Sequence, residues 1–198
     1  MKRTLVRDVR IGETVTLKGW VQETRQLSKM AFLLLRDFSG IIQCIVPGEL
    51  MKQAREIGDE FVVELTGKAK TAQIKSDIDR KDLEIDVQSL TVLSESMSLP
   101  VQVKEKSSSA QLPTRLDYRF LDTRKRDVSA IFKIRSAFYR HMVDFFADES
   151  FTIINTPKLT TIGLESGAES FEVKYFDKKA YLAQSPQFYK QMFVMGGF

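Results

Sequence analysis

Residues 181–191, Tyr-Leu-Ala-Gln-Ser-Pro-Gln-Phe-Tyr-Lys-Gln, read as a strand that passes directly into a helix. The first three residues, Tyr181 to Ala183, are typical of a buried strand. Ser185 is a favourable N-cap, and Pro186 suits the first helical position, where its missing N–H group costs nothing. This strand-to-helix turn is the feature around which the second half of the chain is organised.

Polar side chains gather at the start of the predicted helix. Gln187 and Lys190 are three residues apart and therefore share one face of its first turn. Free N–H groups, a hydroxyl, an amide and an ammonium can together bind a small carboxylate. We hypothesise that Ser185, Gln187 and Lys190 bind an amino acid. The alternative is a capped surface helix with a solvated lysine, which the spacing alone favours.

The residues before this stretch predict a helix, a strand and a hairpin. Apolar residues at helical spacing predict a helix over about 128–147, whose apolar face belongs to a core or an interface. Residues 151–154 predict a strand that Thr156 and Pro157 end, because proline cannot donate to a sheet ladder. Alternation, a turn and a return strand predict the hairpin at 171–175, 177–179 and 180–183. A sheet of about three strands would be incomplete, so we expect the chain to stop within a domain.

Five short stretches in the first half alternate apolar and polar residues, as half-buried strands do. They lie at 15–21, 31–36, 41–46, 61–65 and 83–87, with 90–93 as an extension of the last. A helix predicted over 49–57 falls between the third and the fourth strand. This order is that of an OB barrel, which holds oligonucleotides on its second and third strands and nearby loops.

An aromatic residue and an amide stand on these two strands. On the barrel model, Phe32 could stack on an unpaired base and Gln43 could read the edge of that base. Arg25, in the loop before the second strand, could bind a phosphate or a base. The alternative, of at least equal weight, places Phe32 in the core and Gln43 in solvent. Trp20 could lie on either side of the sheet.

The predicted fold is mainly β plus α+β, in three parts. Residues 1–95 form the barrel domain, and residues 127–198 form the beginning of a second domain. Between them, residues 96–126 have the serine-rich and polar composition of a linker. The end of this linker is rich in basic residues, which fit a solvated connector and an RNA-backbone contact equally well on charge alone. These residues are Arg115, Arg119, Arg124, Lys125 and Arg126.

Composition excludes several classes of protein. The chain is 43% hydrophobic and 28% charged, and no apolar run is long enough to span a membrane, so we expect a cytoplasmic globular protein. A single cysteine, Cys44, excludes an internal disulfide and fits a reducing compartment. One cysteine and one histidine cannot form a zinc site, so we expect no metal centre in this chain. The net charge of +4 is compatible with an anionic partner.

Four stretches resemble a known family. The segment GWVQETRQLSKMAFLLLRDFSGIIQCIV resembles the anticodon-binding barrel of class IIb aminoacyl-tRNA synthetases. RLDYRFLDTR resembles the segment that opens their antiparallel-sheet catalytic domain, and FTIINTPKL resembles class II motif 1, with Pro157 as its proline. YLAQSPQFYKQ resembles the amino-acid-binding strand and helix of aspartyl-tRNA synthetases of the archaeal and eukaryotic type. The resemblance covers nearly the whole chain apart from the serine-rich segment.

The resemblance implies roles for individual residues. Lys190 would pair with the side-chain carboxylate of aspartate, and Gln187 and Ser185 would orient the amino acid. Residues 162–170 on their own predict a solvated loop, but the resemblance implies that Glu165 meets the ammonium group of aspartate. Phe32 would stack on the central anticodon base, with Gln43 on the edge of that base and Arg25 beside it. Pro157 and the preceding helix would belong to a homodimer interface.

The resemblance also implies partners that this chain would not hold by itself. The implied reaction joins L-aspartate to tRNA for aspartate, and possibly for asparagine, with ATP and Mg²⁺. The arginines that bind ATP in this family belong to motifs 2 and 3, which normally follow the position where this chain ends. We therefore expect no catalytic residue in these 198 residues and no activation of aspartate by them alone. The alternatives are a non-enzymatic module that binds tRNA or single strands and dimerises, and an asparaginyl or lysyl relative.

Overall fold

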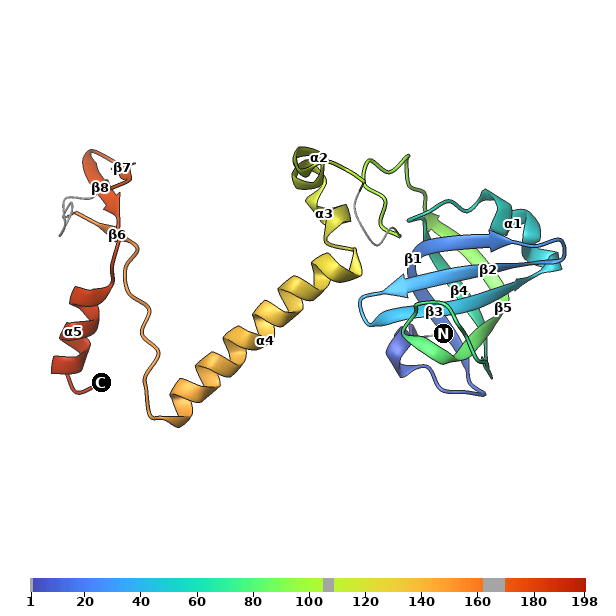
Figure 1. Ribbon diagram of the computed structural model, residues 1–198, viewed down its shortest axis with the longest axis horizontal. Coiled ribbons are helices and arrows are strands. Elements are labelled where there is room, and N and C mark those ends of the chain that lie inside the picture. The colour runs from blue at the N-terminus through green and yellow to red at the C-terminus, as the bar shows by residue number, and fades with distance from the viewer. Residues whose placement is uncertain (1, 105–108, 162–169) are drawn as a thin grey trace. The chain divides into compact units, whose positions relative to one another are not determined.

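The computed structural model describes residues 2–104, 109–161 and 170–198. The chain divides into two compact units, Met1–Ala130 and Ile131–Phe198. The first unit contains the strands β1 to β5, and the second contains β6 to β8 (Figure 1). No helix in the described part of the chain is both long and apolar enough to cross a membrane.

The first unit is built on a closed five-stranded barrel with the order β1-β2-β3-β5-β4. The strands are Thr14–Gln26, Met30–Asp37, Gly40–Pro47, Val62–Thr71 and Arg80–Ser94. The short helices η2 (Gly48–Leu50) and α1 (Met51–Glu56) lie between β3 and β4. The five predicted strands and the helix in their predicted order are therefore confirmed. The fifth strand includes residues 90–93, as the sequence suggested, because β5 pairs with β4 over most of its length.

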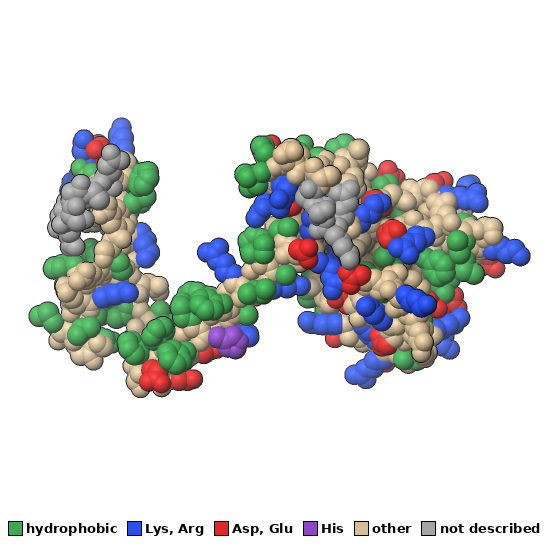
Figure 2. Space-filling view, in the orientation of Figure 1, with side chains coloured by type: hydrophobic (Ala, Val, Ile, Leu, Met, Phe, Trp, Pro, Cys, Tyr) green, Lys and Arg blue, Asp and Glu red, His purple; other side chains and the backbone are tan. Residues whose placement is uncertain are grey.

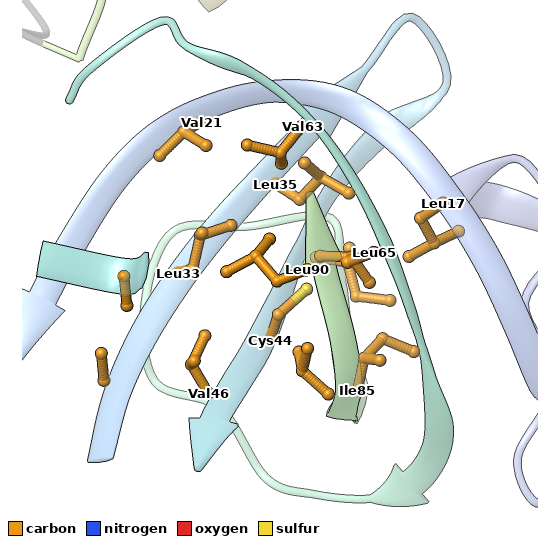
Figure 3. Close-up of a cluster of buried hydrophobic side chains, with 14 of the residues drawn as sticks. Leu17, Val21, Leu33, Leu35, Cys44, Val46, Val63, Leu65, Ile85 and Leu90 are labelled. Carbon is orange, nitrogen blue, oxygen red and sulfur yellow. The ribbon is translucent and has the colours of Figure 1, made fainter. Parts of the chain in front are cut away.

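Side chains that alternate along the strands fill the interior of this barrel. Figure 3 shows Leu17 and Val21 of β1, Leu33 and Leu35 of β2, and Cys44 of β3 pointing into one cluster. All five are fully buried. Each buried aliphatic side chain of this size contributes about 1.5–3 kcal/mol relative to exposure, so this interior supplies most of the stability of the first unit.

The chain before β1 closes one end of the barrel. Val6, in the 3₁₀ helix η1 (Val6–Asp8), and Val9 both belong to the core cluster. The Val6 N–H group donates to Oδ2 of Asp37 at 3.0 Å, and Nη1 of Arg80 donates to the carbonyl oxygens of Val6 and Val9 at 3.1 and 2.9 Å. These bonds fix the N-terminal segment to β2 and β5.

Residues 96–126, which we call the joint, contact the barrel unit at both ends: Ser96 donates to the Asp59 carbonyl oxygen and Arg124 pairs with Glu60. Its described part contains two short helices, α2 (Leu112–Asp117) and α3 (Arg119–Asp122). Val101, Val103 and Leu121 form a small buried cluster of their own. This cluster and the ion pair of Arg124 with Glu60 hold the described part of the joint in place, so it is not a solvated connector.

The second unit has a helix, a small sheet and a second helix. Helix α4 (Arg126–Asp148) begins at the end of the first unit, and α5 (Gln187–Met195) follows the sheet. The sheet has the order β6-β8-β7, with all pairs antiparallel. Its strands are Leu159–Thr160, Glu172–Tyr175 and Lys178–Leu182. The helix predicted over 128–147 and the hairpin of β7 and β8 are confirmed.

Two sequence-based expectations for the second unit are wrong. Residues 151–154 form no strand, because a strand needs a hydrogen-bonded neighbour and no described strand of this unit pairs with them. The strand that ends near Tyr181 is also not buried as expected. Tyr181 is half-buried and Leu182 is 45% exposed, because β8 has β6 and β7 at its edges and little cover on its faces.

Candidate nucleic-acid interface and amino-acid site

The three residues predicted to meet a base line one pocket on the outside of the barrel. Arg25, Phe32, Leu34 and Gln43 surround a volume of about 170 Å³. Arg25 of β1 pairs in register with Phe32 of β2, and Leu34 of β2 pairs with Gln43 of β3. Because Leu33 points inward, its neighbours Phe32 and Leu34 point outward. The alternative that Phe32 is a core residue is therefore wrong.

Both polar residues of this base pocket (Arg25, Phe32, Leu34 and Gln43) are held by carboxylates. Nε and Nη2 of Arg25 donate to the two carboxylate oxygens of Glu23 at 2.8 and 3.1 Å. This hydrogen bonding lowers the pKa of the Glu23 carboxyl and raises the pKa of Arg25. Nε2 of Gln43 donates to Oε2 of Glu84 at 2.9 Å, so the amide is oriented before any ligand arrives. A polar pocket with a pre-oriented amide and an aromatic wall can hold one unpaired base.

Trp20 lies outside the barrel core but is not a free stacking surface. The guanidinium carbon of Arg124 lies 4.7 Å from the centre of its ring, and that of Arg36 lies 5.8 Å away. The tryptophan therefore stacks with the arginine-rich end of the joint. This contact removes Trp20 from the set of residues that could receive a base.

The basic residues of the joint bind carboxylates of the first unit. Arg115 and Arg119 both donate to Asp122, whose side chain is fully buried. Arg124 pairs with Glu60 of the barrel, and Arg126 pairs with Asp77. A structural role therefore accounts for much of the charge that the sequence could assign either to solvent or to RNA.

Sequence reasoning missed two residues of this region. Leu34 completes the base pocket, and only its place in the alternation of β2 could have indicated that it faces outward. Glu60 is 5% exposed and forms ion pairs with two arginines. It nevertheless lies in a polar turn, with φ of 63°. No local pattern marks such a residue, because its partner Arg124 is 64 positions away.

The second site lies at the start of α5. Ser185, Gln187 and Lys190, the three predicted amino-acid ligands of the described chain, line one open pocket of about 610 Å³. Helix α5 begins at Gln187, one residue later than predicted, and Pro186 precedes it. The N-cap is therefore Pro186 and not Ser185 as predicted, although the Ser185 hydroxyl oxygen accepts the Gln187 N–H group at 3.1 Å. The other lining residues are Pro186, Gln191, Val194 and Met195.

Two other predicted site residues are not placed in a site. Glu165 lies outside the residues that the structure describes. Pro157 is exposed in the irregular segment before β6. Among the described residues, no group of three or more His, Cys, Asp or Glu side chains could hold a metal ion.

Comparison with protein families assigns both halves of the chain. Residues 15–93 match the OB-fold nucleic acid binding domain, and residues 111–198 match the tRNA synthetases class II (D, K and N). The barrel and the start of α5 thus both lie in segments with family matches. Residues 111–198 are thus similar to the class II tRNA synthetases of this group, and residues 15–93 to the OB-fold nucleic acid binding domain.

The individual proteins to which the chain is similar include synthetases for aspartate and for asparagine. The chain is 42% identical over 193 residues to an aspartate–tRNA(Asp/Asn) ligase of Methanococcus maripaludis strain S2, with 94% of the chain and 43% of the relative covered. It superposes with a TM-score of 0.85 and 29% identity on asparaginyl-tRNA synthetase from Pyrococcus horikoshii complexed with asparaginyl-adenylate, covering 99% of the chain and 46% of that structure. For aspartyl-tRNA synthetase from Entamoeba histolytica, the TM-score is 0.76 with 28% identity, 99% of the chain and 44% of that structure. The chain therefore spans less than half the length of these proteins.

Proposed function

We propose that the chain serves an aspartate–tRNA ligase, in which the barrel binds the tRNA anticodon and the start of α5 selects L-aspartate. The observation that carries this proposal is the convergence of Ser185, Gln187 and Lys190 on one pocket at a helix N-terminus. The 42% identity to an aspartate–tRNA(Asp/Asn) ligase supports the same assignment. Which tRNAs the protein charges, aspartate alone or also asparagine, is left open by this proposal.

Selection of aspartate would rest on the charge of Lys190. An ammonium that donates to a carboxylate contributes about 1.5–3 kcal/mol per hydrogen bond when the pair is shielded from water. Asparagine would leave the ammonium without a charged partner. Lys190 is exposed in the described structure, and a pair in water is worth only about 1 kcal/mol. Full discrimination therefore requires shielding of this pair from water. Glu165, which lies outside the described residues, is proposed only as the partner of the ammonium group of aspartate.

On the barrel, the base pocket would receive one unpaired anticodon base. Phe32 supplies the stacking surface, Gln43 the hydrogen-bonding edge and Arg25 a positive charge for base or phosphate. Stacking on an aromatic side chain is worth about 1–3 kcal/mol per base, which makes Phe32 the main source of affinity in this pocket.

ATP and Mg²⁺ belong to the proposal only for the whole protein. The described residues form no group that could hold a metal ion, and the pocket at α5 has one cation, Lys190, which the proposal commits to aspartate. We therefore assign no step with ATP to this chain, and expect it not to catalyse aspartate-dependent exchange of ATP and pyrophosphate by itself.

We also propose a cytoplasmic homodimer. Helix α4 exposes a row of apolar side chains, and Figure 2 displays hydrophobic side chains along this helix. Phe151 and Ile153, in the unpaired segment that follows, are 65% and 63% exposed. An apolar face of this kind next to an unpaired extended segment suits a second copy of the chain. Pro157 would lie at the edge of that interface.

Binding of amino acids to the chain tests the proposal. Ligand-observed NMR should detect weak binding of L-aspartate, stronger than that of L-asparagine by about fivefold, given about 1 kcal/mol for a pair in water. Lys190→Met should abolish the preference, whereas Lys174→Met, on β7 and away from the pocket, should leave it unchanged. Stronger binding of asparagine would favour an asparaginyl relative. Binding of an anticodon stem-loop without any binding of aspartate would favour a non-enzymatic module.

A further inference from the structure

The loop between β4 and β5, residues 72–79, packs on the outer face of the barrel. Its residue Ile78 is buried and forms a cluster with Leu34 of β2 and Ile41 of β3, separate from the barrel core. Leu34 also lines the base pocket. One side chain therefore belongs both to the base pocket and to the contact that holds this loop on the barrel.

The same loop holds the first residue of α4. Nη1 of Arg126 donates to the carbonyl oxygen and to Oδ1 of Asp77, at 3.3 and 3.1 Å. Nη2 of Arg126 lies 3.5 Å from Oδ1 of Asp79. The other carboxylate oxygen of Asp79 accepts the Ile41 N–H group at 2.8 Å. The Asp79 carboxylate therefore connects strand β3 to the start of α4.

These contacts move together because of their order in the chain. Asp77 and Asp79 flank Ile78, so a movement of the loop that separates Ile78 from Leu34 also displaces both carboxylates from Arg126. The base pocket and the first turn of α4 are thus connected through three consecutive residues.

The attachment of α4 to the loop is weak enough to open. The side chains of Arg126 and Asp77 are 51% and 67% exposed, and exposed ion pairs contribute little to stability. The buried Glu60–Arg124 pair can keep the joint on the barrel while this attachment opens. The Ser129 N–H group donates to the carbonyl oxygen of Lys125 at 2.8 Å, so its hydrogen exchange reports on the first turn of the helix.

A base in the base pocket would favour the packed position of the loop. Leu34 is 7% exposed while Ile78 packs against it. Without Ile78, Leu34 loses the contact that fixes its side chain, and the pocket loses a defined wall. A ligand shifts an equilibrium only through its difference in affinity for the two states, and the defined wall supplies that difference.

We propose that the β4–β5 loop is a conformational relay from the base pocket to α4. A base stacked on Phe32 stabilises the packing of Ile78 on Leu34, and Asp77 and Asp79 then hold Arg126 and order the first turn of α4. The proposal rests on the proposed base binding by the barrel and adds a consequence of that binding. Because α4 continues past Ala130 into the second unit, its first turn is a covalent route by which occupancy of the barrel reaches that unit.

Amide hydrogen exchange of the chain, followed by NMR with and without an anticodon stem-loop, tests this relay. Binding should slow exchange about twofold to fivefold at Ile41, which reports on the loop, and at Ser129, which reports on α4. The control amide is that of Gly12, which donates to the carbonyl oxygen of Ala69 in the turn before β1. This turn is at the opposite end of β1 from Arg25, so its exchange should not change.

Two substitutions interrupt the relay at different steps. Ile78→Ala removes the contact with Leu34, so the stem-loop should no longer slow exchange at Ser129. Its affinity should also fall about twofold to fivefold, because coupling between two sites is reciprocal. Asp77→Ala removes a carboxylate that holds Arg126, so the stem-loop should still slow exchange at Ile41 but no longer at Ser129.

A matched control is Asp8→Ala, which breaks an exposed ion pair with Arg7 outside the relay and should leave both responses intact. A purely structural role of Asp77 would speed exchange at Ser129 with and without RNA and preserve the response to RNA, which would overturn the relay. Stem-loop binding without slower exchange at Ser129, or with equal slowing at Gly12, would also overturn it and leave the proposed anticodon site standing. Absence of any stem-loop binding would overturn both proposals.

Discussion

Arg124 donates a hydrogen bond from Nη1 to Oε2 of Glu60, a carboxylate whose side chain is only 3% exposed. Nη2 of Arg36 lies 2.8 Å from each oxygen of the same carboxylate. One buried anion therefore joins strand β2 to the joint, and Trp20 lies against both guanidinium groups. This arrangement explains why an arginine-rich segment is ordered on the barrel.

Removal of the charge of Glu60 should destabilise the first unit strongly. Glu60→Gln leaves two guanidinium groups without their anion, and breaking a buried pair costs about 3–5 kcal/mol. We expect about 3 kcal/mol, since the glutamine oxygen can still accept one hydrogen bond. Urea unfolding followed by the fluorescence of Trp20, the single tryptophan, measures this change.

The control for this experiment is an ion pair on the barrel surface. Glu64 of β4 pairs with Lys18 of β1, and both side chains are more than a third exposed. Glu64→Gln should cost less than about 1 kcal/mol. Equal losses for Glu60→Gln and Glu64→Gln would contradict the structural role assigned to the buried pair.

Gly19 provides a second test of how the barrel is packed. A Cβ atom at this position would lie 2.3 Å from the carbonyl oxygen of Arg36, which is backbone and cannot move aside alone. Gly19→Ala should therefore destabilise the barrel by about 3 kcal/mol or more, the upper range for overpacking. At Gly48 the nearest atom would be 3.2 Å away, so Gly48→Ala should cost clearly less. A thermal melt of both variants by circular dichroism would reveal the difference, and similar melting temperatures would refute it.

The sequence predicted the barrel better than it predicted the site. Alternation such as that of Leu33 and Leu35 is a local signal, and every barrel strand carries it. The Glu60–Arg124 pair joins residues far apart in the chain, and the Gln43–Glu84 bond spans 41 positions, so neither leaves a local pattern. The strand predicted at residues 151–154 is wrong although the local signal was present. Their composition favours a strand, but a strand also needs a hydrogen-bonded partner, which composition does not reveal.

The single cysteine reports on opening of the barrel. Cys44 is fully buried on β3, and burial, with a smaller effect of the Glu84 carboxylate, raises the pKa of its thiol. The thiolate is the reactive form, so iodoacetamide should modify the folded chain far more slowly than the unfolded chain. Mass spectrometry along a urea series should show modification rising with unfolding, and rapid modification without urea would contradict the buried position.

The raised pKa of the Cys44 thiol makes the free energy of unfolding fall as the pH becomes alkaline. In the folded state the pKa of Cys44 lies above its ordinary value of 9.0, so the folded state keeps the thiol proton to a higher pH than the unfolded state does. This contribution is therefore complete below pH 9 and is lost as the pH rises above it. The free energy of unfolding should fall by about 1.4 kcal/mol per pH unit relative to Cys44→Ala. Parallel pH profiles for the two proteins would show that the thiol is not responsible.

Phe32 is the residue on which the proposed anticodon site depends most directly. Its ring lies on the outer face of β2 beside Arg25 and Gln43, so truncation removes the stacking surface without opening a cavity in the barrel core. Phe32→Ala should weaken binding of the anticodon stem-loop by about 1–3 kcal/mol, which is about fivefold to 150-fold. Phe32→Tyr keeps an aromatic face and should retain most of the affinity. Fluorescence anisotropy at fixed salt measures both variants, and because Phe32 is outside the core cluster, their unfolding midpoints should stay close to that of the unsubstituted chain. Equal affinities of the alanine and tyrosine variants would mean that no base stacks on this residue.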